Sequence, residues 1–261
     1  MKKISAYIIA YNEEEKVAAA IESVRWADEV VLADSHSRDR TAEIAAGLGA
    51  RVVQIDFNGF GDLRNRAIEA CTHEWIFSLD ADERCTPEAA AEMRRAVEAD
   101  RHDLFLVPRR NFFLGREIRH SGWTPNYRQP QLFRKGRMTY EPSPVHEGWV
   151  NHSARPVGRL TQAIWQLPYR NLEEVLAKVN RYSTLGATKP RQAGSTMGRA
   201  FAHGLWAFLR HYVFKRGVLD GWAGLLIAIS YFEVTFYRYA KTYELAHRDE
   251  WALQWQRITT R

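Results

Sequence analysis

Two aspartates follow an apolar run in the first third of the chain. The residues Ile76-Phe77-Ser78-Leu79 lead directly into Asp80-Ala81-Asp82-Glu83. Because successive strand side chains alternate between faces, residues two apart in an extended segment point the same way. Two carboxylates placed like this supply the oxygen ligands that Mg2+ or Mn2+ prefers. The same pattern also fits an acidic turn before a helix, since Thr86-Pro87 is typical of an N-cap and a first-turn proline.

Other polar residues stand where further apolar runs end. Residues 4–10 are followed by Tyr11-Asn12-Glu13, and residues 29–33 are followed by Asp34. The carboxyl ends of parallel strands share one edge of a sheet, and ligands of such sheets bind outside that edge. We therefore expect these side chains to gather with Asp80 and Asp82 at one edge.

The elements that must position these residues alternate between strand and helix patterns up to about residue 107. The expected strands cover residues 4–10, 29–33, 51–55, 75–79 and 104–107, and the expected helices cover 15–26, 41–48, 62–71 and 87–99. This alternation predicts an α/β fold with a doubly wound, mostly parallel sheet. The first strand is not followed by Gly-x-Gly-x-x-Gly, and there is no Gly-Lys-Ser/Thr loop, which argues against a dinucleotide dehydrogenase and a P-loop NTPase.

The second half of the chain has a different character. Residues 111–165 are rich in Arg, aromatic residues, Pro and Gly, and predict short strands, one of which carries His146 and Glu147. Residues 166–261 predict helices, and their uncharged run 221–232 is shorter than the roughly 20 apolar residues of a membrane-spanning helix. Aromatic residues beside Arg and Lys favour helices that lie in a lipid headgroup region, with a buried hairpin or a subunit interface as alternatives. We expect three segments: the α/β segment 1–110; the strand-rich segment 111–165, which belongs to the same domain; and the helical segment 166–261.

Composition narrows the class of partner. The chain carries 37 Lys and Arg against 31 Asp and Glu, a net charge of +6. The basic residues dominate the second half, which indicates an anionic partner such as nucleic acid, phosphorylated glycan or anionic lipid, or else a solvated basic surface. Cys71 and Cys85 do not form a disulfide framework, and the apolar start is too short for a signal peptide, so we expect a cytoplasmic protein.

Taken together, the motifs resemble those of inverting, nucleotide-sugar-dependent glycosyltransferases of family 2, which have the GT-A fold. The resemblance lies in Ile8-Ile9-Ala10-Tyr11-Asn12-Glu13-Glu14, Asp34-Ser35-x-Ser37-x-Asp39-x-Thr41, Arg64-Asn65-x-Ala67 and Asp80-Ala81-Asp82-Glu83. Further motifs are similar to those of lipopolysaccharide core β-1,4-glucosyltransferases: Gly122-Trp123-x-Pro125, Leu132-Phe133-Arg134-Lys135, Val145-His146-Glu147, Lys178-x-Asn180-x-Tyr182-Ser183 and Lys215-Arg216-Gly217-x-Leu219-Asp220-Gly221. Gln131 and Asn126 depart from that subgroup, which has Arg and an acid there.

The resemblance implies a role for each residue of the donor site. Tyr11, Asn12 and Glu13 would line the uridine and ribose pocket, and Asp34 would accept a hydrogen bond from uracil. Arg64 and Asn65 would lie near the base or the diphosphate, where an Arg fork pairs well with phosphate oxygens. Asp82 would bind a divalent cation, Mg2+ or Mn2+, directly, and Asp80 would bind it through water or contact the ribose.

Inversion by a single displacement requires one carboxylate to take the proton of the acceptor hydroxyl. Glu147 is our candidate for this base, and Glu83 is the competing candidate. His146 is a further possible ligand of the metal or the diphosphate. A structural role for His146 and Glu147 in a strand is the alternative.

The resemblance implies transfer of a hexose, with glucose from UDP-glucose as the specific expectation, onto a heptose of the lipopolysaccharide inner core. Such an enzyme would act as a peripheral protein on the cytoplasmic face of an anionic membrane. The alternatives are a polyprenyl-phosphate sugar synthase, another cell-surface glycan glycosyltransferase, and a non-catalytic nucleic-acid-binding protein. Acidic strand ends argue against nucleic acid as a partner, since without a metal they repel phosphate. The oligomeric state stays open.

Overall fold

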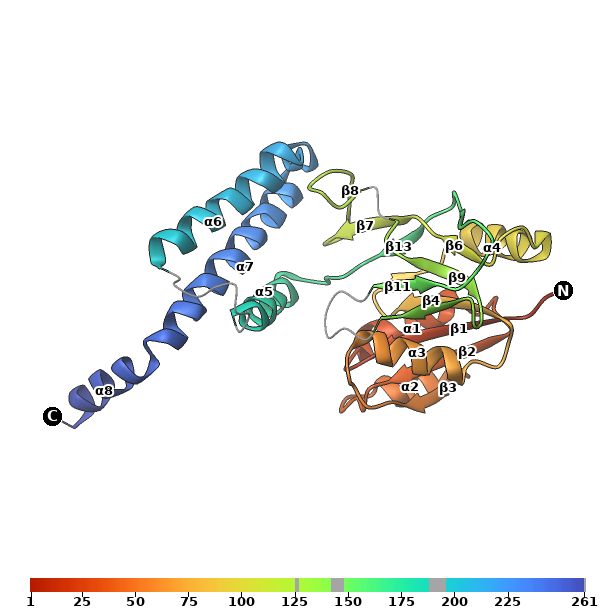
Figure 1. Ribbon diagram of the computed structural model, residues 1–261, viewed down its shortest axis with the longest axis horizontal. Helices are drawn as coiled ribbons and strands as arrows, with labels where there is room; N and C mark the ends of the chain where they lie inside the picture. Colours follow the sequence, from red (N-terminus) through yellow and green to blue (C-terminus); the bar gives the residue numbers. More distant parts are fainter. Residues whose placement is uncertain (125–126, 142–147, 188–195, 261) are drawn as a thin grey trace. The chain divides into compact units, whose positions relative to one another are not determined.

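The computed structural model describes residues 1–124, 127–141, 148–187 and 196–260 (Figure 1). These residues form two compact units. The first comprises Met1–Phe112 and Pro125–Pro168, and the second comprises Phe113–Thr124 and Tyr169–Arg261. His146 and Glu147 lie outside the described residues.

The first unit is built on a seven-stranded sheet. Its strand order is β12 (Gly158–Arg159), β6 (Leu104–Leu106), β9 (Pro130–Arg134), β4 (Trp75–Asp80), β1 (Ile4–Ala10), β2 (Glu29–Asp34) and β3 (Arg51–Gln54). Only β9 runs antiparallel to its neighbours β4 and β6; the other pairs are parallel. The prediction of a doubly wound, mostly parallel α/β sheet is therefore confirmed.

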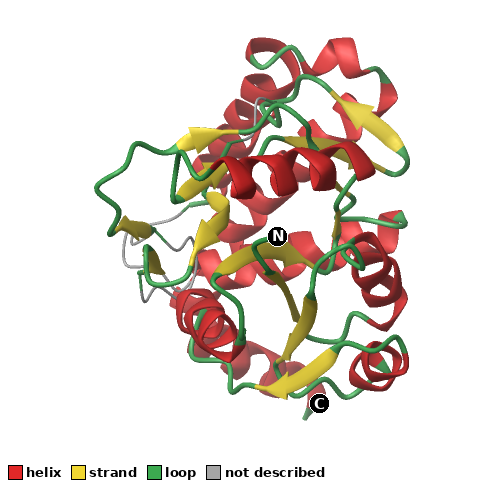
Figure 2. Ribbon diagram, turned by 90° about the vertical axis from the view of Figure 1, so that its right-hand side faces the viewer, coloured by secondary structure: helices red, strands yellow, loops and turns green. Residues whose placement is uncertain are grey.

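Helices cover both faces of this sheet (Figure 2). Ile4, Ala6 and Ile8 of β1 pack into one core with residues of α1 (Glu14–Ser23), α2 (Thr41–Gly47) and α4 (Pro87–Ala99). Tyr7 and Ile9 pack into a second core with α3 (Phe60–Ala70) on the opposite face. A strand buried on both faces needs apolar residues at nearly every position, which explains why residues 4–10 are apolar except for Ser5.

The expected cap of the helix after the aspartates is also present. The Thr86 hydroxyl accepts a hydrogen bond of 3.1 Å from the Ala89 N–H, and Pro87 occupies the first turn of α4. The turn between β4 and α4 contains the two-residue strand β5 (Glu83–Arg84). Asp82 therefore lies in a short link between β4 and β5.

Short strands complete the first unit. β13 (Ile164–Gln166) pairs with β5 in antiparallel fashion and with β7 (Arg109–Phe113) in parallel. β10 (Met138–Tyr140) and β11 (Trp149–Asn151) form an antiparallel pair. The strand-rich character expected for residues 111–165 is confirmed, although part of the strand expected at 145–149 falls on residues that the structure does not describe.

The second unit is mainly helical. It contains β8 (Arg116–Ile118), α5 (Leu172–Ala187), α6 (Met197–Leu209), the π-helical turn η2 (Arg210–Phe214), the 3-10 turn η3 (Gly217–Asp220), α7 (Trp222–Ala246) and α8 (Arg248–Thr259). α7 packs against both α5 and α6. The Lys241 ammonium of α7 donates to the Asn180 side chain at 2.6 Å and to the Ser183 hydroxyl at 2.9 Å, which accounts for two residues of the Lys178-x-Asn180-x-Tyr182-Ser183 motif. Within the described residues, none of the helices is long and apolar enough to cross a membrane.

A carboxylate anchors the link between α6 and α7. Asp220 is buried and accepts hydrogen bonds from the N–H groups of Arg119 and His120, both at 3.1 Å, and from the Ser121 hydroxyl at 2.7 Å. Gly217 lies so close to the His211 carbonyl that a Cβ would approach it to 2.6 Å. The Lys215–Gly221 motif thus specifies a tight, anchored turn.

Candidate functional site

The ends of three neighbouring strands bring the acidic residues to one edge of the sheet. In the register of the sheet, Ala10 of β1 lies beside Asp34 of β2, and Ile9 lies beside Asp80 of β4. Tyr11, Asn12 and Glu13 continue directly from β1. The expected gathering of polar residues at the carboxyl edge is therefore present, and the ligand that each residue binds stays a prediction.

Asn12 and Asp34 are joined through Ser37. The backbone of Asn12 has the left-handed conformation (φ 55°), and its N–H donates to the Ser37 hydroxyl at 2.9 Å. That hydroxyl and the Ser37 N–H both donate to the Asp34 carboxylate, which is fully buried. These bonds fix the segment after β1 to the loop after β2, while the Tyr11 side chain remains 51% exposed.

A second pair of residues reinforces this connection. The Glu13 N–H donates to the Thr41 hydroxyl at 2.8 Å, and the Glu14 N–H donates to Asp39 at 3.1 Å. The Thr41 hydroxyl in turn donates to Asp39 at 2.5 Å. The Asp34-Ser35-x-Ser37-x-Asp39-x-Thr41 motif therefore supplies the acceptors that hold residues 12–14 in place.

Arg64 lies beneath Asp80. Its side chain is only 6% exposed and donates to the Asp80 carboxylate at 2.8 Å and to the Ser78 hydroxyl at 3.3 Å. Burial raises the pKa of Asp80, but the positive charges of Arg64 and Arg109 outweigh it and hold that pKa below its ordinary value. Arg64 is therefore not a surface helix residue, and it keeps Asp80 ionised.

Glu83, like Asp34, is a fully buried acid of the site. It has no exposed surface, and its carboxylate is ion-paired with Arg109. It also accepts hydrogen bonds from the Asp80 N–H at 3.0 Å and from the Gln131 amide at 3.1 Å. Burial, together with the charges of Asp80 and Asp82, raises the pKa of Glu83 to about 7 against the opposing effect of Arg109. Its three donors place Glu83 as a support for the Asp80–Asp82 turn.

Asn65 binds backbone rather than pointing away from the protein. Its side-chain N–H donates to the Tyr140 carbonyl and its oxygen accepts from the Tyr140 N–H, both at 2.9 Å. The Arg64 guanidinium lies 5.5 Å from the centre of the Tyr140 ring. The Arg64-Asn65 pair thus fixes α3 both to β4 and to β10.

Asp82 is partly exposed, and its carbonyl accepts a hydrogen bond of 2.8 Å from the Leu167 N–H. Across the described residues there is no cluster of three or more His, Cys, Asp and Glu side chains able to hold a metal. The carboxylate oxygens of Asp80 and Asp82 are nevertheless the type of ligand that a hard cation takes. Mg2+ commonly binds one or two protein carboxylates and completes its coordination shell with phosphate oxygens and water.

Sequence reasoning missed the support role of Arg109, Gln131 and Tyr140. In β7, Arg109, Asn111 and Phe113 lie on the buried side, while Arg110 is exposed. The sequence does not distinguish the two arginines, because Phe112 shares a face with Arg110 just as Phe113 shares one with Arg109. No local pattern marks Gln131 either, which the structure places against Glu83.

Comparison with known proteins places this arrangement in context. The model of the family Glycosyl transferase family 2 matches residues 5–154. The lipopolysaccharide core biosynthesis glycosyltransferase LpsC of Rhizobium meliloti is 32% identical over 203 residues, which cover 73% of each protein. An uncharacterized glycosyltransferase of Rickettsia bellii is 28% identical over 94% of this chain and 87% of its own length. The solved structure of S. aureus TarS 1-349 has a similar fold, with a TM-score of 0.51 at 15% identity over 94% of this chain and 92% of that one.

Proposed function

Because the chain belongs to glycosyl transferase family 2, we propose that it transfers a hexose from a UDP-sugar, specifically glucose from UDP-glucose, onto a heptose of the lipopolysaccharide inner core. The reaction would invert the donor configuration and form a β-linkage. Similarity to LpsC supports a lipopolysaccharide core acceptor. The observation that carries the proposal is the convergence of Asp34, Asp80 and Asp82 at one sheet edge, with Arg64 beneath Asp80.

The donor would lie along this edge. Tyr11 and Glu13 would flank the uridine and ribose. Asp34 would accept the imide N–H of uracil after the loop at Ser37 moves aside, because Asp34 is fully buried and bonded to Ser37 in this structure. TarS has been solved in complex with UDP, which is the nucleotide part of the donor proposed here. Asp82, with His146, would hold a divalent cation, which when bound would offset the charge of the leaving diphosphate.

The chemical step is a single displacement. The acceptor hydroxyl oxygen attacks the anomeric carbon, the bond from that carbon to the diphosphate oxygen breaks, and UDP leaves with the electron pair. The hydroxyl proton passes to a carboxylate. We assign this role to Glu147, because Glu83 is fully buried and already accepts hydrogen bonds from Arg109, Gln131 and the Asp80 N–H. The Glu83 carboxylate would then act on the reaction only by fixing the turn that carries Asp80 and Asp82.

The proposed acceptor is linked to lipid, so the reaction would take place at the cytoplasmic face of a membrane, with the protein bound peripherally. Segments 1–110 and 111–165 would form the catalytic domain, and segment 166–261 would serve attachment. The excess of Lys and Arg in the second half of the chain supports an anionic surface as the partner.

A two-stage experiment tests the proposal. Thermal shifts with UDP-, GDP- and dTDP-sugars, each with and without Mn2+, identify the donor, and mass spectrometry then identifies the product on a heptose-containing core acceptor. We expect a shift with UDP-glucose that Asp82→Ala abolishes, together with its transfer activity. Glu88→Ala, which removes an exposed acid from the first turn of α4, is the matched control and should behave as wild type. A sugar on polyprenyl phosphate, or metal-dependent transfer by Asp82→Ala at the wild-type rate, would contradict the assignment.

A further inference from the structure

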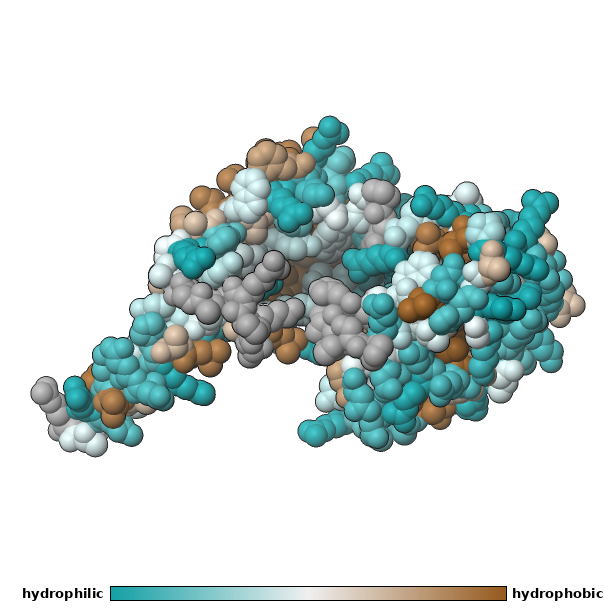
Figure 3. Space-filling model, viewed as in Figure 1, coloured by the Kyte–Doolittle hydropathy of each residue, from teal (hydrophilic) through white to brown (hydrophobic). Residues whose placement is uncertain are grey.

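The outward side of α6 and η2 carries a continuous set of exposed apolar side chains, which we call the α6 outer face. It consists of Leu205, Trp206, Leu209, Val213 and Phe214. The rings of Trp206 and Phe214 lie 5.5 Å apart, so the set continues from α6 into η2. In the space-filling view, brown side chains follow the outer edge of α6 (Figure 3).

The inward side of α6 is already occupied, so this face is not needed for the fold of the second unit. Ala200 and Gly204 are buried, and a Cβ on Gly204 would lie 3.0 Å from the Phe232 ring of α7. The Phe201 ring edge and the His203 ring also contact α7, through Phe232 and Tyr239. α6 therefore packs on α7 through its opposite side, and the α6 outer face has no partner among the described residues.

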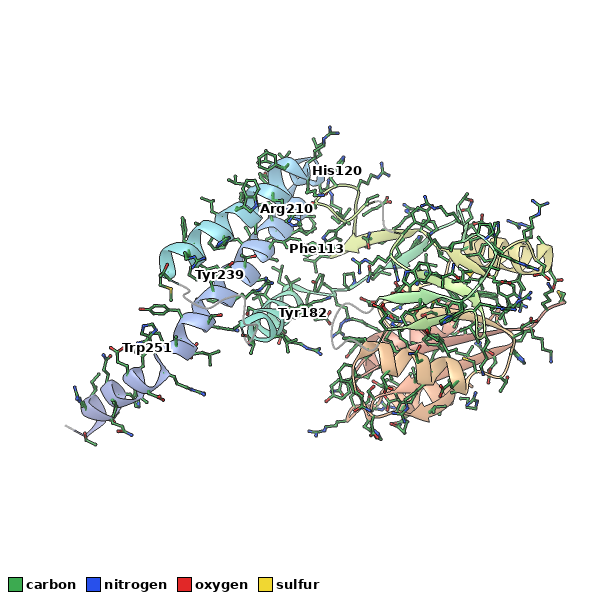
Figure 4. All side chains as sticks on the ribbon, in the orientation of Figure 1. Phe113, His120, Tyr182, Arg210, Tyr239 and Trp251 are labelled. Atoms are coloured by element: carbon green, nitrogen blue, oxygen red, sulfur yellow. The ribbon has the colours of Figure 1, made fainter. Side chains whose placement is uncertain are left out.

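Basic residues border this face at its two ends. Eight Lys or Arg and no Asp or Glu lie between residues 175 and 219. Arg199 and Arg210 are exposed and lie about three helical turns apart, on the same side of α6, and Lys215 and Arg216 are exposed directly after η2. The first acid beyond them, Asp220, is buried against residues 119–121. Figure 4 shows Arg210 at the end of α6 near this turn.

We propose that the α6 outer face binds the surface of an anionic phospholipid bilayer, with its aromatic and aliphatic side chains among the acyl chains and with Arg199, Arg210, Lys215 and Arg216 at the lipid phosphates. Apolar side chains bordered by Lys and Arg, with Trp among them, are typical of helices that lie in a membrane interface. A second copy of the chain on this face would bring Lys and Arg of both copies together, with no Asp or Glu between residues 175 and 219 to pair with them, and like charges across an interface weaken binding. The charge of this face therefore favours lipid over a second copy of the chain.

The α6 outer face would be the attachment surface of the proposed enzyme. Only its location at a membrane rests on the proposed function. Vesicle binding is measured on the full chain without donor or acceptor, so its failure leaves transfer to a soluble acceptor untouched. The probes are vesicles of phosphatidylethanolamine with phosphatidylglycerol, and vesicles of phosphatidylcholine alone. We expect co-sedimentation with the first and little with the second, and a decline in binding as salt is added.

Two matched double variants test the face. Trp206→Ser with Phe214→Ser removes side chains that are 56% and 65% exposed, and should weaken partition onto phosphatidylglycerol vesicles by about tenfold or more. Trp255→Ser with Ile258→Ser removes side chains of α8 that are 69% and 71% exposed, and should leave partition unchanged. Circular dichroism and the thermal shift with UDP-glucose should match wild type in both.

A charge variant keeps the proposal testable if the first variant fails to fold. Arg210→Ser with Lys215→Ser and Arg216→Ser should lose binding to phosphatidylglycerol vesicles while the chain remains folded. Wild-type partition by folded Trp206→Ser/Phe214→Ser, or loss of binding only in the α8 variant, would overturn the proposal. So would a sedimentation experiment in which the α6 variant abolishes a dimer but not vesicle binding, since the face would then be a subunit interface.

Discussion

The ion pair between Arg109 and Glu83 offers the sharpest test of how the acidic turn is held. The side chains of Arg109 and Glu83 are 4% and 0% exposed, so neither charge is shared with water. Replacing Arg109 with Met removes the positive partner and leaves a buried carboxylate. Loss of one member of a buried ion pair costs about 3 to 5 kcal/mol of unfolding free energy. Because Gln131 and the Asp80 N–H still donate to Glu83, we expect a loss of about 3 kcal/mol for Arg109→Met at pH 8, where Glu83 is mostly ionised in wild type.

The size of this loss should depend on pH. Glu83 has a pKa raised to about 7 by burial and by the charges of Asp80 and Asp82, even with Arg109 beside it. An acid with a raised pKa in the folded state stabilises the fold below its unfolded pKa and loses that contribution as pH rises through the folded pKa. Without Arg109 the pKa rises further, and each unit adds about 1.4 kcal/mol to the cost of ionisation. The difference between Arg109→Met and wild type should therefore widen between pH 5 and pH 8.

Urea denaturation of both proteins across this pH range measures the effect. An unchanged slope of unfolding free energy against urea concentration would show that the folded state has not changed its compactness. Arg110→Met is the matched control, since Arg110 is the next residue of β7 and points to the exposed side; it should cost less than about 1 kcal/mol. The double variant Arg109→Met with Glu83→Leu should recover part of the loss. A loss below about 1 kcal/mol for Arg109→Met at pH 8, or an equal loss at pH 5 and pH 8, would refute the reasoning.

Three further predictions concern other parts of the chain. Glu147→Gln should retain the thermal shift with UDP-glucose and stop turnover, and normal turnover would move the base to another residue. Burial raises the pKa of Glu29, but hydrogen bonds, with that from Ser5 the largest, lower this pKa to about 2 overall. Wild type should therefore lose up to about 3 kcal/mol of unfolding free energy as pH falls from 5 to 2. Glu29→Gln should be less stable than wild type at neutral pH and should lose less stability on acidification. Lys241→Met should lower stability by about 1.5 to 3 kcal/mol, because the ammonium donates to Asn180 and Ser183 at 2.6 and 2.9 Å; a thermal denaturation curve identical to that of wild type would contradict this.

The sequence by itself determined the sheet and the edge at which the polar residues gather. Residues 4–10 and 75–79 are apolar at almost every position because strands buried on both faces leave no position for water. Thr86-Pro87 marked the start of α4 because capping depends on residues within one helical turn. Such signals are local, so they can be recognised without knowing which segments meet.

Only the tertiary structure decided what holds the acidic turn in place. Arg109 and Glu83 are 26 residues apart, Gln131 is 48 residues from Glu83, and Asn65 binds the backbone of Tyr140 across 75 residues. Asp220 and the loop at residues 119–121 are likewise joined across about 100 residues. A buried charge is stable only beside a compensating partner, but its own neighbours in sequence do not say which distant residue supplies that partner. The positions of the carboxylates were therefore local information, whereas their ionisation and rigidity depend on contacts that form only when the chain folds.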